Sequence, residues 1–596
     1  MATPSQGDTK SPASAGLPSS GPTISHERSQ LHTSQGPPGY GTVGTSSSVR
    51  ISVSAGEGSH LTNRSTGSSI APTPLDKGSD DGKHGETFDD VPEVFRRLGL
   101  FSAINLIFNY VIGVGIYVSP GLILKGVGSV GVSLIMWVIG VVIAAAGTAV
   151  YIELGTGLPK SGGDKNYLEY LFQNPAYLMT CIFAAYSTIA KTSTANSVVF
   201  GEYVLHALGV QPTPENIRTV AHICLSIVTF IHGTNVKWGI LLQDILGAFK
   251  IVVLVAISVC GILSLAGVRG FQVLDGYEKP HNFEWKYLWE GTVFDMKAYS
   301  TAIYTVLWSF IGYQNANYAL SEIKNPIKTL KHASIVGVSI VSVIYIFVNI
   351  AFFAVVAKSD ILDNSKVIVS LFFRNLFGQT AERFLSFLVA LSILGSVFAG
   401  QFTQGRVVQE LGREGILPFS HIFSSNRPFG APLAGLFAQY ITSSALLYVN
   451  PPGDGFLFIV SLGSYCIFVI NLFVSMGLLF VRIKTPGEFN LFQWNPPFRA
   501  PISIVLVYVL ANVLLILTPF IPPGNGSPTY DHLPYWSHAV VAFGISLVGI
   551  AYWYWFAVWH PTKKGYILQR EIVTPQHIHD LKRFTFVKIP VLKDLD

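Results

Sequence analysis

Two segments of this sequence combine glycine with polar residues inside apolar surroundings, an arrangement suited to binding a small charged ligand. The first is residues 111–116, with the sequence VIGVGI, followed by Ser119, Pro120 and Gly121. The second is residues 308–317, WSFIGYQNAN, which is rich in small and polar side chains. A glycine inside a helix costs about 1 kcal/mol relative to alanine, so both segments are candidates for an interrupted helix.

An interrupted membrane helix offers main-chain groups as ligands. Lipid does not tolerate free N–H and C=O groups, whereas a ligand cavity does. The N–H groups at the start of a half-helix carry partial positive charge and suit a carboxylate, and freed carbonyl oxygens suit an ammonium group. The alternative interpretation is close packing between helices, for which small residues are common in membranes.

The two segments lie among twelve apolar runs that we interpret as transmembrane helices, since about 20 residues cross a hydrocarbon core. The interruptions fall in the first and sixth runs, which are corresponding positions in two five-helix halves. Such a pair is typical of a transporter's binding site and favours the ligand-binding interpretation. The predicted helices lie near residues 99–123, 130–155, 176–200, 217–235, 241–266, 299–321, 334–357, 384–405, 431–449, 457–481, 501–521 and 537–559.

Composition also predicts an all-α polytopic membrane protein. Of the 596 residues, 49% are hydrophobic and 12% are charged, whereas a soluble protein carries roughly a quarter charged residues. A β-barrel would need segments of about 10 residues with strict alternation, but residues 251–266 and 336–357 are apolar without alternation. The net charge of +5 fits basic cytoplasmic loops better than a nucleic-acid surface, so no nucleic-acid partner is expected.

The chain divides into one transporter domain and two tails. Residues 1–85, dominated by Ser, Thr, Gly and Pro, are predicted to form a disordered cytoplasmic N-terminal tail. An acidic and basic juxtamembrane segment follows at 86–98. The twelve-helix domain then covers 99–559, and a cytoplasmic C-terminal tail covers 560–596.

Charge placement predicts that both termini lie in the cytoplasm. Arg96 and Arg97 directly precede the first helix and favour a cytoplasmic start, and twelve crossings return the chain to that side. This topology places the sequon at Asn525 in an extracellular loop. Tail lysines such as Lys10 and Lys77 are candidate acceptors for regulation by a ubiquitin ligase, with an unregulated tail as the alternative.

Four short motifs, in the same order, resemble those of the amino acid–polyamine–organocation superfamily. They are residues 113–116 with Pro120, then 159–164 (PKSGGD), 322–326 (EIKNP) and 412–418 (GREGILP). Within the superfamily the sequence is most similar to the L-type branch, and especially to fungal high-affinity methionine permeases. The resemblance implies a leucine-transporter-like core of 5+5 inverted repeats with discontinuous helices 1 and 6, and a plasma-membrane permease that needs no cofactor.

The resemblance also assigns roles within the two interrupted segments. It implies that the N–H groups of Val114 and Gly115 receive the substrate carboxylate, and that carbonyl oxygens of Ile112, Trp308 and Ile311 receive its ammonium group. The side chains at 308, 310, 311 and 313 are expected to line the pocket. The complete predicted site is Ile112, Gly113, Val114, Gly115, Ile116, Trp308, Phe310, Ile311, Gly312 and Tyr313.

Two of these residues depart from the pattern of the family and bear on the substrate. Ile311 stands where the family commonly has glycine, and Tyr313 where it commonly has tryptophan. Because Ile311 narrows the pocket, a slender thioether or aliphatic side chain fits better than a bulky aromatic one. We therefore expect import of a neutral amino acid, with methionine favoured.

Two lysines lie inside predicted helices, and intramembrane charges are functional candidates. Residues 243–250 resemble the fifth-helix pattern of sodium-independent members, in which a lysine ammonium replaces a bound sodium ion. This resemblance implies that role for Lys250, and hence proton symport without sodium. Because burial makes a lysine titrate more readily, Lys250 is also a candidate for proton coupling. The alternatives are a lysine that snorkels or pairs with Asp244. Lys191 is open between a functional role and a polar contact between helices.

The sequence leaves alternative functions open. An exchanger of large neutral amino acids and an amino acid sensor of the same fold are alternatives. An enzyme is disfavoured, since neither HExxH nor a suitable GxSxG motif occurs, and no Cys/His cluster has metal-binding spacing. Residues 191–222 contain no cysteine, so no disulfide-linked heavy chain of the kind used by animal L-type carriers is expected. Glu153 and Glu322 are expected to form gate pairs with loop lysines.

Overall fold

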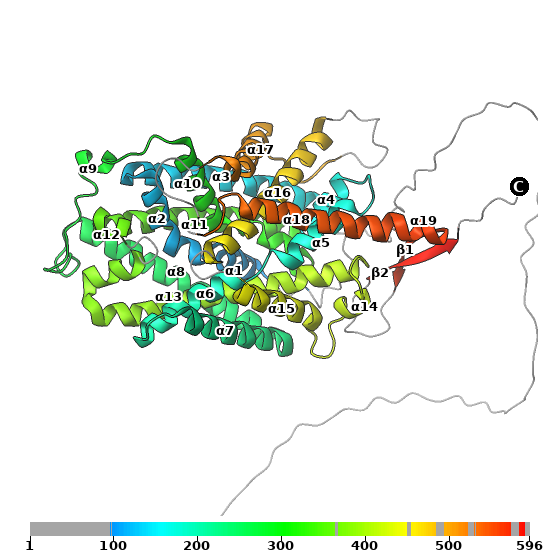
Figure 1. Ribbon diagram of the computed structural model, residues 1–596, viewed down its shortest axis with the longest axis horizontal. Helices are drawn as coiled ribbons and strands as arrows, with labels where there is room; N and C mark the ends of the chain where they lie inside the picture. The colour runs from blue at the N-terminus through cyan, green and yellow to red at the C-terminus, as the bar shows by residue number, and fades with distance from the viewer. Residues whose placement is uncertain are drawn as a thin grey trace, which may run out of the picture. The chain divides into compact units, whose positions relative to one another are not determined.

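A computed structural model describes residues 96, 98–363, 368–449, 455–483, 494–522, 530, 532–573 and 583–590. The predicted N-terminal tail and the sequon at Asn525 lie outside these residues. The described chain is almost entirely helical, and its long helices run side by side in a bundle (Figure 1).

The first half of the chain begins with the helix interrupted at the first glycine segment. Helices of 5 to 30 residues then follow up to the second glycine segment. The elements are α1 (Leu100–Val111), α2 (Val114–Val127), α3 (Val130–Gly157), α4 (Asp164–Leu171), α5 (Leu178–Ile189), α6 (Thr194–Leu208), α7 (Pro214–Thr234), α8 (Val236–Leu265), α9 (Trp285–Trp289), α10 (Met296–Phe310) and the 3₁₀ helix η2 (Asn315–Glu322).

The second half contains the longest helices and ends in a two-stranded sheet. Its elements are α11 (Pro326–Val355), α12 (Lys358–Asp363), α13 (Ile368–Arg413), α14 (Ser420–Phe423), α15 (Leu433–Val449), α16 (Gly455–Ile483), α17 (Ile502–Leu517), η3 (Thr518–Phe520), α18 (Ser537–Trp553), the π-helical η4 (Tyr554–Trp559), α19 (His560–Lys564), β1 (Tyr566–Val573) and β2 (Arg583–Pro590). The sheet is antiparallel, with Tyr566 opposite Pro590.

Nine helices in the described part of the chain are long and apolar enough to cross a membrane. The other three predicted crossings correspond to shorter or interrupted elements. The third is divided into α5 and α6, the sixth into α10 and η2, and the ninth, α15, has only 17 residues. The eighth is longer than predicted, because α13 begins at Ile368 and bends at Gly378, whose φ is +80°.

The predicted interruptions coincide with breaks in the helical backbone. Ile112 and Gly113 separate α1 from α2. The chain leaves α10 at Ile311, whose ψ is 126°, and turns at Gly312, whose φ is +124°. A side chain at position 312 would be strained at this φ, and its Cβ would lie 2.6 Å from Cδ1 of Tyr110.

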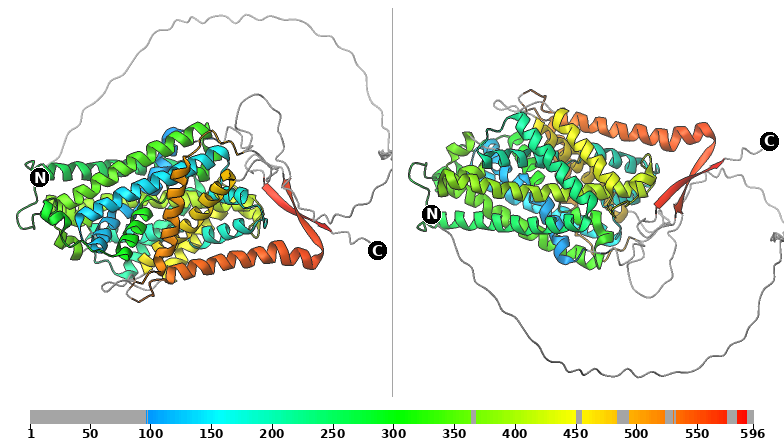
Figure 2. Two further views of the ribbon diagram at one scale, coloured as in Figure 1. Left: turned by 90° about the horizontal axis from the view of Figure 1, so that it is seen from above. Right: turned by 90° about the horizontal axis from the view of Figure 1, so that it is seen from below.

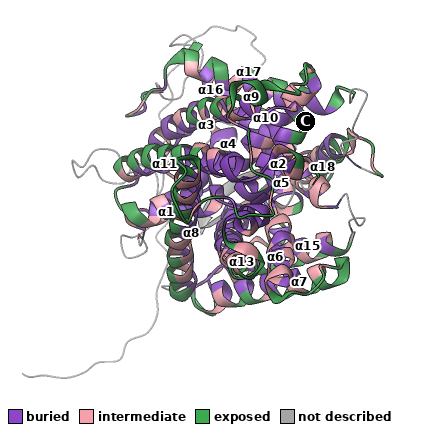
Figure 3. Cartoon of the chain, turned by 90° about the vertical axis from the view of Figure 1, so that its left-hand side faces the viewer, coloured by how far each residue is buried: buried purple, intermediate pink, exposed green. Residues whose placement is uncertain are grey.

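The interrupted helices lie inside the bundle. In the most apolar part of α1 and α2, 89% of residues are buried, against 22% in the α18–α19 helix and 39% in α7 and α8. Figure 3 shows this arrangement, with buried residues in the middle and exposed ones around them. Large apolar side chains on the outer face of α8, including Trp238, Ile245 and Val252, are exposed, as expected of a surface in contact with lipid.

The last helix continues beyond the predicted boundary at residue 559. The continuous α18–α19 helix runs along one side of the bundle and leads directly into the β1–β2 sheet (Figure 2). We expected only a tail after residue 559. A sheet was not predicted there.

Candidate substrate-binding site

A cavity of about 110 Å³ lies where the interrupted helices meet. Its wall combines the α1–α2 break, the end of α10, the segment between α5 and α6, and faces of α13 and α16. Five of the ten residues predicted from sequence line it: Gly113, Val114, Gly115, Trp308 and Ile311. Two distant parts of the sequence therefore contribute to a single site.

The other five predicted residues do not line this cavity. Ile112 and Ile116 are fully buried beside it. Phe310 packs edge-on against Trp137 and lies against Tyr345, away from the cavity. The remaining two are Gly312, which forms the turn, and Tyr313, which follows it.

Tyr313 points toward a different part of the bundle from the one we expected. Its hydroxyl is hydrogen-bonded to that of Tyr508 on α17, and its ring contacts Tyr151 on α3. The reason is the positive φ of Gly312, which redirects the chain immediately before Tyr313. We expected Phe310 and Tyr313 to form the side-chain pocket, but in this conformation neither residue lines the cavity.

The start of α2 presents main-chain donors at the cavity wall. The first N–H groups of a helix have no partner within it, and here they belong to the segment beginning at Val114. Gly115 allows α2 to approach α10 closely, because a Cβ at this position would lie 2.8 Å from Cα of Ser309. Oγ of Ser119 and Oγ of Ser309 are also hydrogen-bonded at 2.8 Å. The glycine thus holds the donor end of α2 directly against α10.

Lys250, on α8, occupies the opposite side of the α1–α2 break. Its Nζ atom donates to the main-chain oxygens of Ile112 and Asn109, at 2.6 and 3.1 Å, and to Oγ of Ser396 at 2.8 Å. The side chain is fully buried. These oxygens are the kind of ligands that a small monovalent cation would use, and a positive charge is favourable at the carbonyl end of α1.

The contacts of Lys250 bear on two sequence-based interpretations. Lys250 does not pair with Asp244 in the structure, and that carboxylate accepts a hydrogen bond from Ser102 instead. The oxygen of Ile112 also accepts a hydrogen bond from Ser396, at 2.8 Å. It therefore already has two donors, and a substrate ammonium group would have to share it.

Tyr345, on α11, was not identified from the sequence but connects the two interruptions. Its hydroxyl donates to the main-chain oxygen of Val111 at 2.9 Å and lies 3.2 Å from that of Ser309. These are carbonyl groups near the ends of α1 and α10. A single tyrosine in an apolar helix gave no signal of this role in the sequence.

A third interruption also reaches the cavity. The chain leaves the helical conformation between α5 and α6, and all four connecting residues, from Ala190 to Ser193, line the cavity. One of them is Lys191, whose role the sequence left open. We predicted one continuous helix across 176–200 and that prediction is wrong. The polar run KTST at 191–194 was the available signal.

Ion pairs join the sequence motif at 412–418 to that at 159–164, and the motif at 322–326 to α13. Glu414 pairs with Lys160 and Lys165, at 2.9 and 2.8 Å, and Glu322 pairs with Arg406 at 3.0 Å. Glu153, fully buried, pairs with Arg482. Glu153 and Glu322 therefore form ion pairs as expected, but their partners are arginines on distant helices rather than loop lysines.

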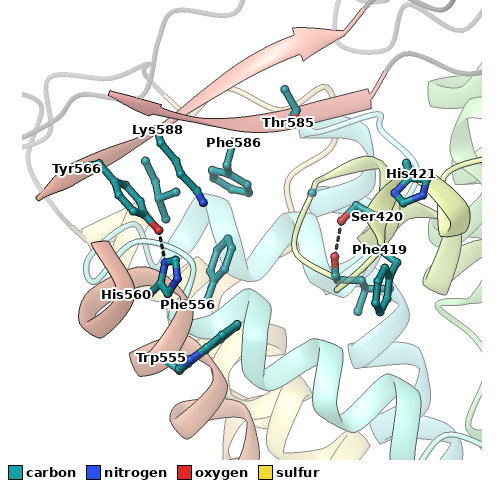
Figure 4. Close-up of a pocket in the computed structure, with 13 residues that line it drawn as sticks. Phe419, Ser420, His421, Trp555, Phe556, His560, Tyr566, Thr585, Phe586 and Lys588 are labelled. Carbon is teal, nitrogen blue, oxygen red and sulfur yellow. Dashed lines mark hydrogen bonds between the residues drawn. The ribbon is translucent and has the colours of Figure 1, made fainter. Parts of the chain in front are cut away.

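A larger cavity, of about 620 Å³, lies beside the C-terminal sheet (Figure 4). Aromatic residues, including Trp555, Phe556 and Phe586, dominate its wall, and Tyr566 is hydrogen-bonded to His560. It shares no lining residue with the cavity at the interrupted helices and contains none of the predicted site residues. Its size alone does not make it the substrate site.

Within the described residues, no group of three or more His, Cys, Asp or Glu side chains is placed to hold a metal ion. The four cysteines, all in described segments, are free thiols: Cys181, Cys224, Cys260 and Cys466. The chemistry of the small cavity is therefore that of main-chain dipoles, hydroxyl and amide groups, and one lysine, Lys191, while Lys250 binds the α1–α2 break without lining the cavity.

Comparison with known proteins agrees with this architecture. Residues 98–545 match the amino acid permease family, and the chain belongs to that family. It is a multi-pass membrane protein, and its relatives are transporters rather than enzymes.

Individual relatives include two methionine permeases. The chain is 40% identical to the high-affinity methionine permease of Saccharomyces cerevisiae, over 81% of this chain and 83% of the relative. It is 31% identical to the low-affinity methionine permease of the same yeast, over 73% and 78%. It is also 32% identical to the b(0,+)-type amino acid transporter 1 of Rattus norvegicus, over 74% and 84%.

Proposed function

We propose that this protein is a secondary active permease that imports a neutral amino acid, methionine above others, by proton symport and without sodium. The observation that carries the proposal is the cavity between the interrupted helices, whose wall combines the main-chain N–H groups at the start of α2 with residues at the carbonyl ends of α1 and α10. A zwitterion leaving water needs both its charges satisfied, and such a cavity offers partners for them.

In the proposed architecture, twelve helices cross the plasma membrane, with both termini in the cytoplasm and a 5+5 inverted-repeat core. The nine long helices and the three shorter segments α5–α6, α10–η2 and α15 account for twelve crossings. The paired breaks after α1 and α10 support the repeat, because they fall at corresponding places in its two halves.

Methionine is favoured by the cavity and by the relatives. Ile311, Val460 and Ile467 give the cavity an apolar wall of modest size, which suits a flexible thioether chain. In this proposal the substrate carboxylate binds the N–H groups at Val114 and Gly115. The substrate ammonium group binds the carbonyl oxygens of Trp308 and Ile311, and it shares the carbonyl oxygen of Ile112 with Lys250.

Independence from sodium follows, in this proposal, from Lys250. Its ammonium group is surrounded by two main-chain oxygens and one hydroxyl, and it leaves a sodium ion no place among them. Protons are then the available coupling ion for uphill import. The carrier works without a disulfide-linked heavy chain, and its tails are sites for regulation by a ubiquitin ligase.

Exchange of large neutral amino acids is the second candidate, supported by the likeness to the b(0,+)-type transporter. Purified full-length protein in liposomes distinguishes the two. We expect labelled methionine to accumulate into empty liposomes when the outside is acidic, with or without sodium. Uptake that requires preloaded internal amino acid would instead identify an exchanger. Binding of methionine without either flux would identify a sensor and refute transport.

A further inference from the structure

The third interruption places a charged group at the substrate cavity that the proposed binding mode does not use. Lys191 lies in the connection between α5 and α6, lines the cavity and is only 6% exposed. Its Nζ atom donates to the hydroxyl oxygen of Tyr318 at 2.8 Å and lies 3.7 Å from Oδ2 of Asp164. A buried ammonium group therefore faces a buried carboxylate, which is 1% exposed, next to the site.

The partners of Lys191 come from segments outside the cavity. Asp164 ends the sequence motif at 159–164 and begins α4, and Tyr318 belongs to η2, just before the motif at 322–326. These two segments are joined by reciprocal hydrogen bonds, from N of Ser161 to Oγ of Ser321 and from N of Ser321 to Oγ of Ser161. The ammonium group thus belongs to the cavity wall, whereas its counter-charge belongs to residues 159–164, which are joined to residues 318–326. We call these two stretches the closing segments.

The other titratable groups around this pair are mainly tyrosine phenols. Lys191 also meets the ring of Phe183 and the thiol of Cys466. The nearby Lys165 is engaged by Glu414 and Glu169. Asp164 accepts hydrogen bonds from the hydroxyls of Tyr151 and Tyr318, and the phenols facing it from other elements are Tyr110, Tyr167, Tyr313 and Tyr508.

We propose that Lys191 carries the coupled proton and that Asp164 controls its release; this inference rests on the proposed proton symport. While the closing segments are in place, the carboxylate stabilises the ammonium form of Lys191. When those segments separate from the cavity, the ammonium group loses its counter-charge in apolar surroundings, where an unpaired charge is costly. The Nζ–H bond then breaks, and the proton passes to water on that side, leaving a neutral amine.

The cycle is completed by proton uptake from the other side. With the cavity open to the opposite solution, the amine takes a proton from water there and again becomes an ammonium ion. Return of Asp164 restores the pair around the newly bound substrate. One proton is carried per cycle, and its release is linked to the same separation of segments that would release the amino acid.

The test compares two fluxes of labelled methionine in liposomes containing the full-length protein. One is accumulation driven by an acid-outside pH gradient, and the other is exchange against internal methionine without a gradient. For Lys191→Met and Asp164→Asn we expect the ratio of gradient-driven to exchange flux to fall by about tenfold or more. The first variant has no amine to carry the proton, and the second has no carboxylate to hold the proton on Lys191 until the segments separate. The matched control is Lys297→Met, a lysine on α10 bonded to main-chain oxygens of Thr518 and Ile521, which should keep the ratio of the wild type.

A conservative variant guards against misfolding. Lys191→Arg keeps a positive charge beside Asp164, but arginine does not give up its proton in proteins. We therefore expect it to exchange methionine without gradient-driven accumulation. Full accumulation by this variant overturns the proposal. A wild-type protein that shows no accumulation refutes proton symport itself, whereas a coupled wild type with equally coupled variants refutes only the role of the pair.

Discussion

The hydroxyl of Tyr345 donates to the main-chain oxygen of Val111, 2.9 Å away, and so fixes the end of α1 at the edge of the substrate cavity. The same hydroxyl lies near the oxygen of Ser309 at the end of α10. One side chain on α11 therefore sets the relative position of the two interruptions on which the proposed binding mode depends.

Removing this hydroxyl should weaken substrate binding. In Tyr345→Phe, the buried oxygen of Val111 keeps only the N–H of Gly113 as a donor, and loss of the tyrosine hydrogen bond costs about 0.5–1.5 kcal/mol. We expect the KM for methionine to rise several-fold and the melting temperature to fall, measured by uptake and by thermal unfolding in detergent. A control is Tyr203→Phe, whose hydroxyl has no hydrogen-bond partner among the described residues. An unchanged KM in Tyr345→Phe would contradict the positioning role.

Replacing Lys250 with a neutral side chain should strongly reduce transport. In Lys250→Met the oxygens of Asn109 and Ile112 lose a charged donor, while the oxygen of Ile112 keeps its hydrogen bond from Ser396 on α13. Hydrogen bonds from charged groups contribute about 1.5–3 kcal/mol each, so we expect methionine uptake to fall at least about tenfold. Uptake is compared at equal surface expression, with and without sodium. Normal uptake by this variant would refute the role of Lys250.

A methyl group at position 115 should block the approach of α2 to α10. In Gly115→Ala the new Cβ would meet Cα of Ser309 at 2.8 Å, so the backbone has to shift. Overpacking of this kind costs about 1–3 kcal/mol, and we expect uptake to fall about tenfold or more. Gly126, on the same helix, has open space around it and is the matched control. If both alanine variants transported alike, the close approach would be irrelevant to function.

Enlarging the cavity at position 311 should broaden the substrate range. Ile311 lines the cavity, and Ile311→Gly removes a branched side chain from its wall. Since one methylene group in a hydrophobic pocket discriminates by about 1–3 kcal/mol, phenylalanine should then compete with methionine about tenfold better than in the wild type. Competition is measured with unlabelled phenylalanine, and Ile303→Ala on the preceding helix α10 serves as control. No gain in competition would argue against Ile311 as the selective residue.

The sequence predicted features that depend on local chemistry. The spacing of glycines in VIGVGI and at Gly312 located both interruptions, and the apolar runs located the long helices to within a few residues for most of them. The direction taken by Tyr313 was not accessible, because it depends on the backbone angles of Gly312 rather than on residue type. The direction taken by Phe310 depends on the packing of α10 against Trp137 and Tyr345.

Contacts between distant segments were also beyond the sequence. Glu153 and Glu322 were expected to pair with lysines of nearby loops, but helix packing brings Arg482 and Arg406 to them. The break at Lys191 was missed because a few polar residues in an apolar run are equally compatible with a continuous helix that makes a polar contact. The proposed role of Lys191 depends on the nearby carboxylate of Asp164, a contact that the sequence did not indicate.

The short connection between α1 and α2 has a mechanical consequence. Lys250 binds the end of α1 to α8 and α13, whereas Gly115 and Ser119 bind α2 to α10. The two halves of the first crossing are thus attached to partly different neighbours, α8 for α1 and α10 for α2, while α13 also bonds α2 through Ser392 and Tyr117. If α8 moves relative to α10, the backbone has to change conformation at Ile112 and Gly113. The hinge of the first crossing would then lie where the amino acid is proposed to bind.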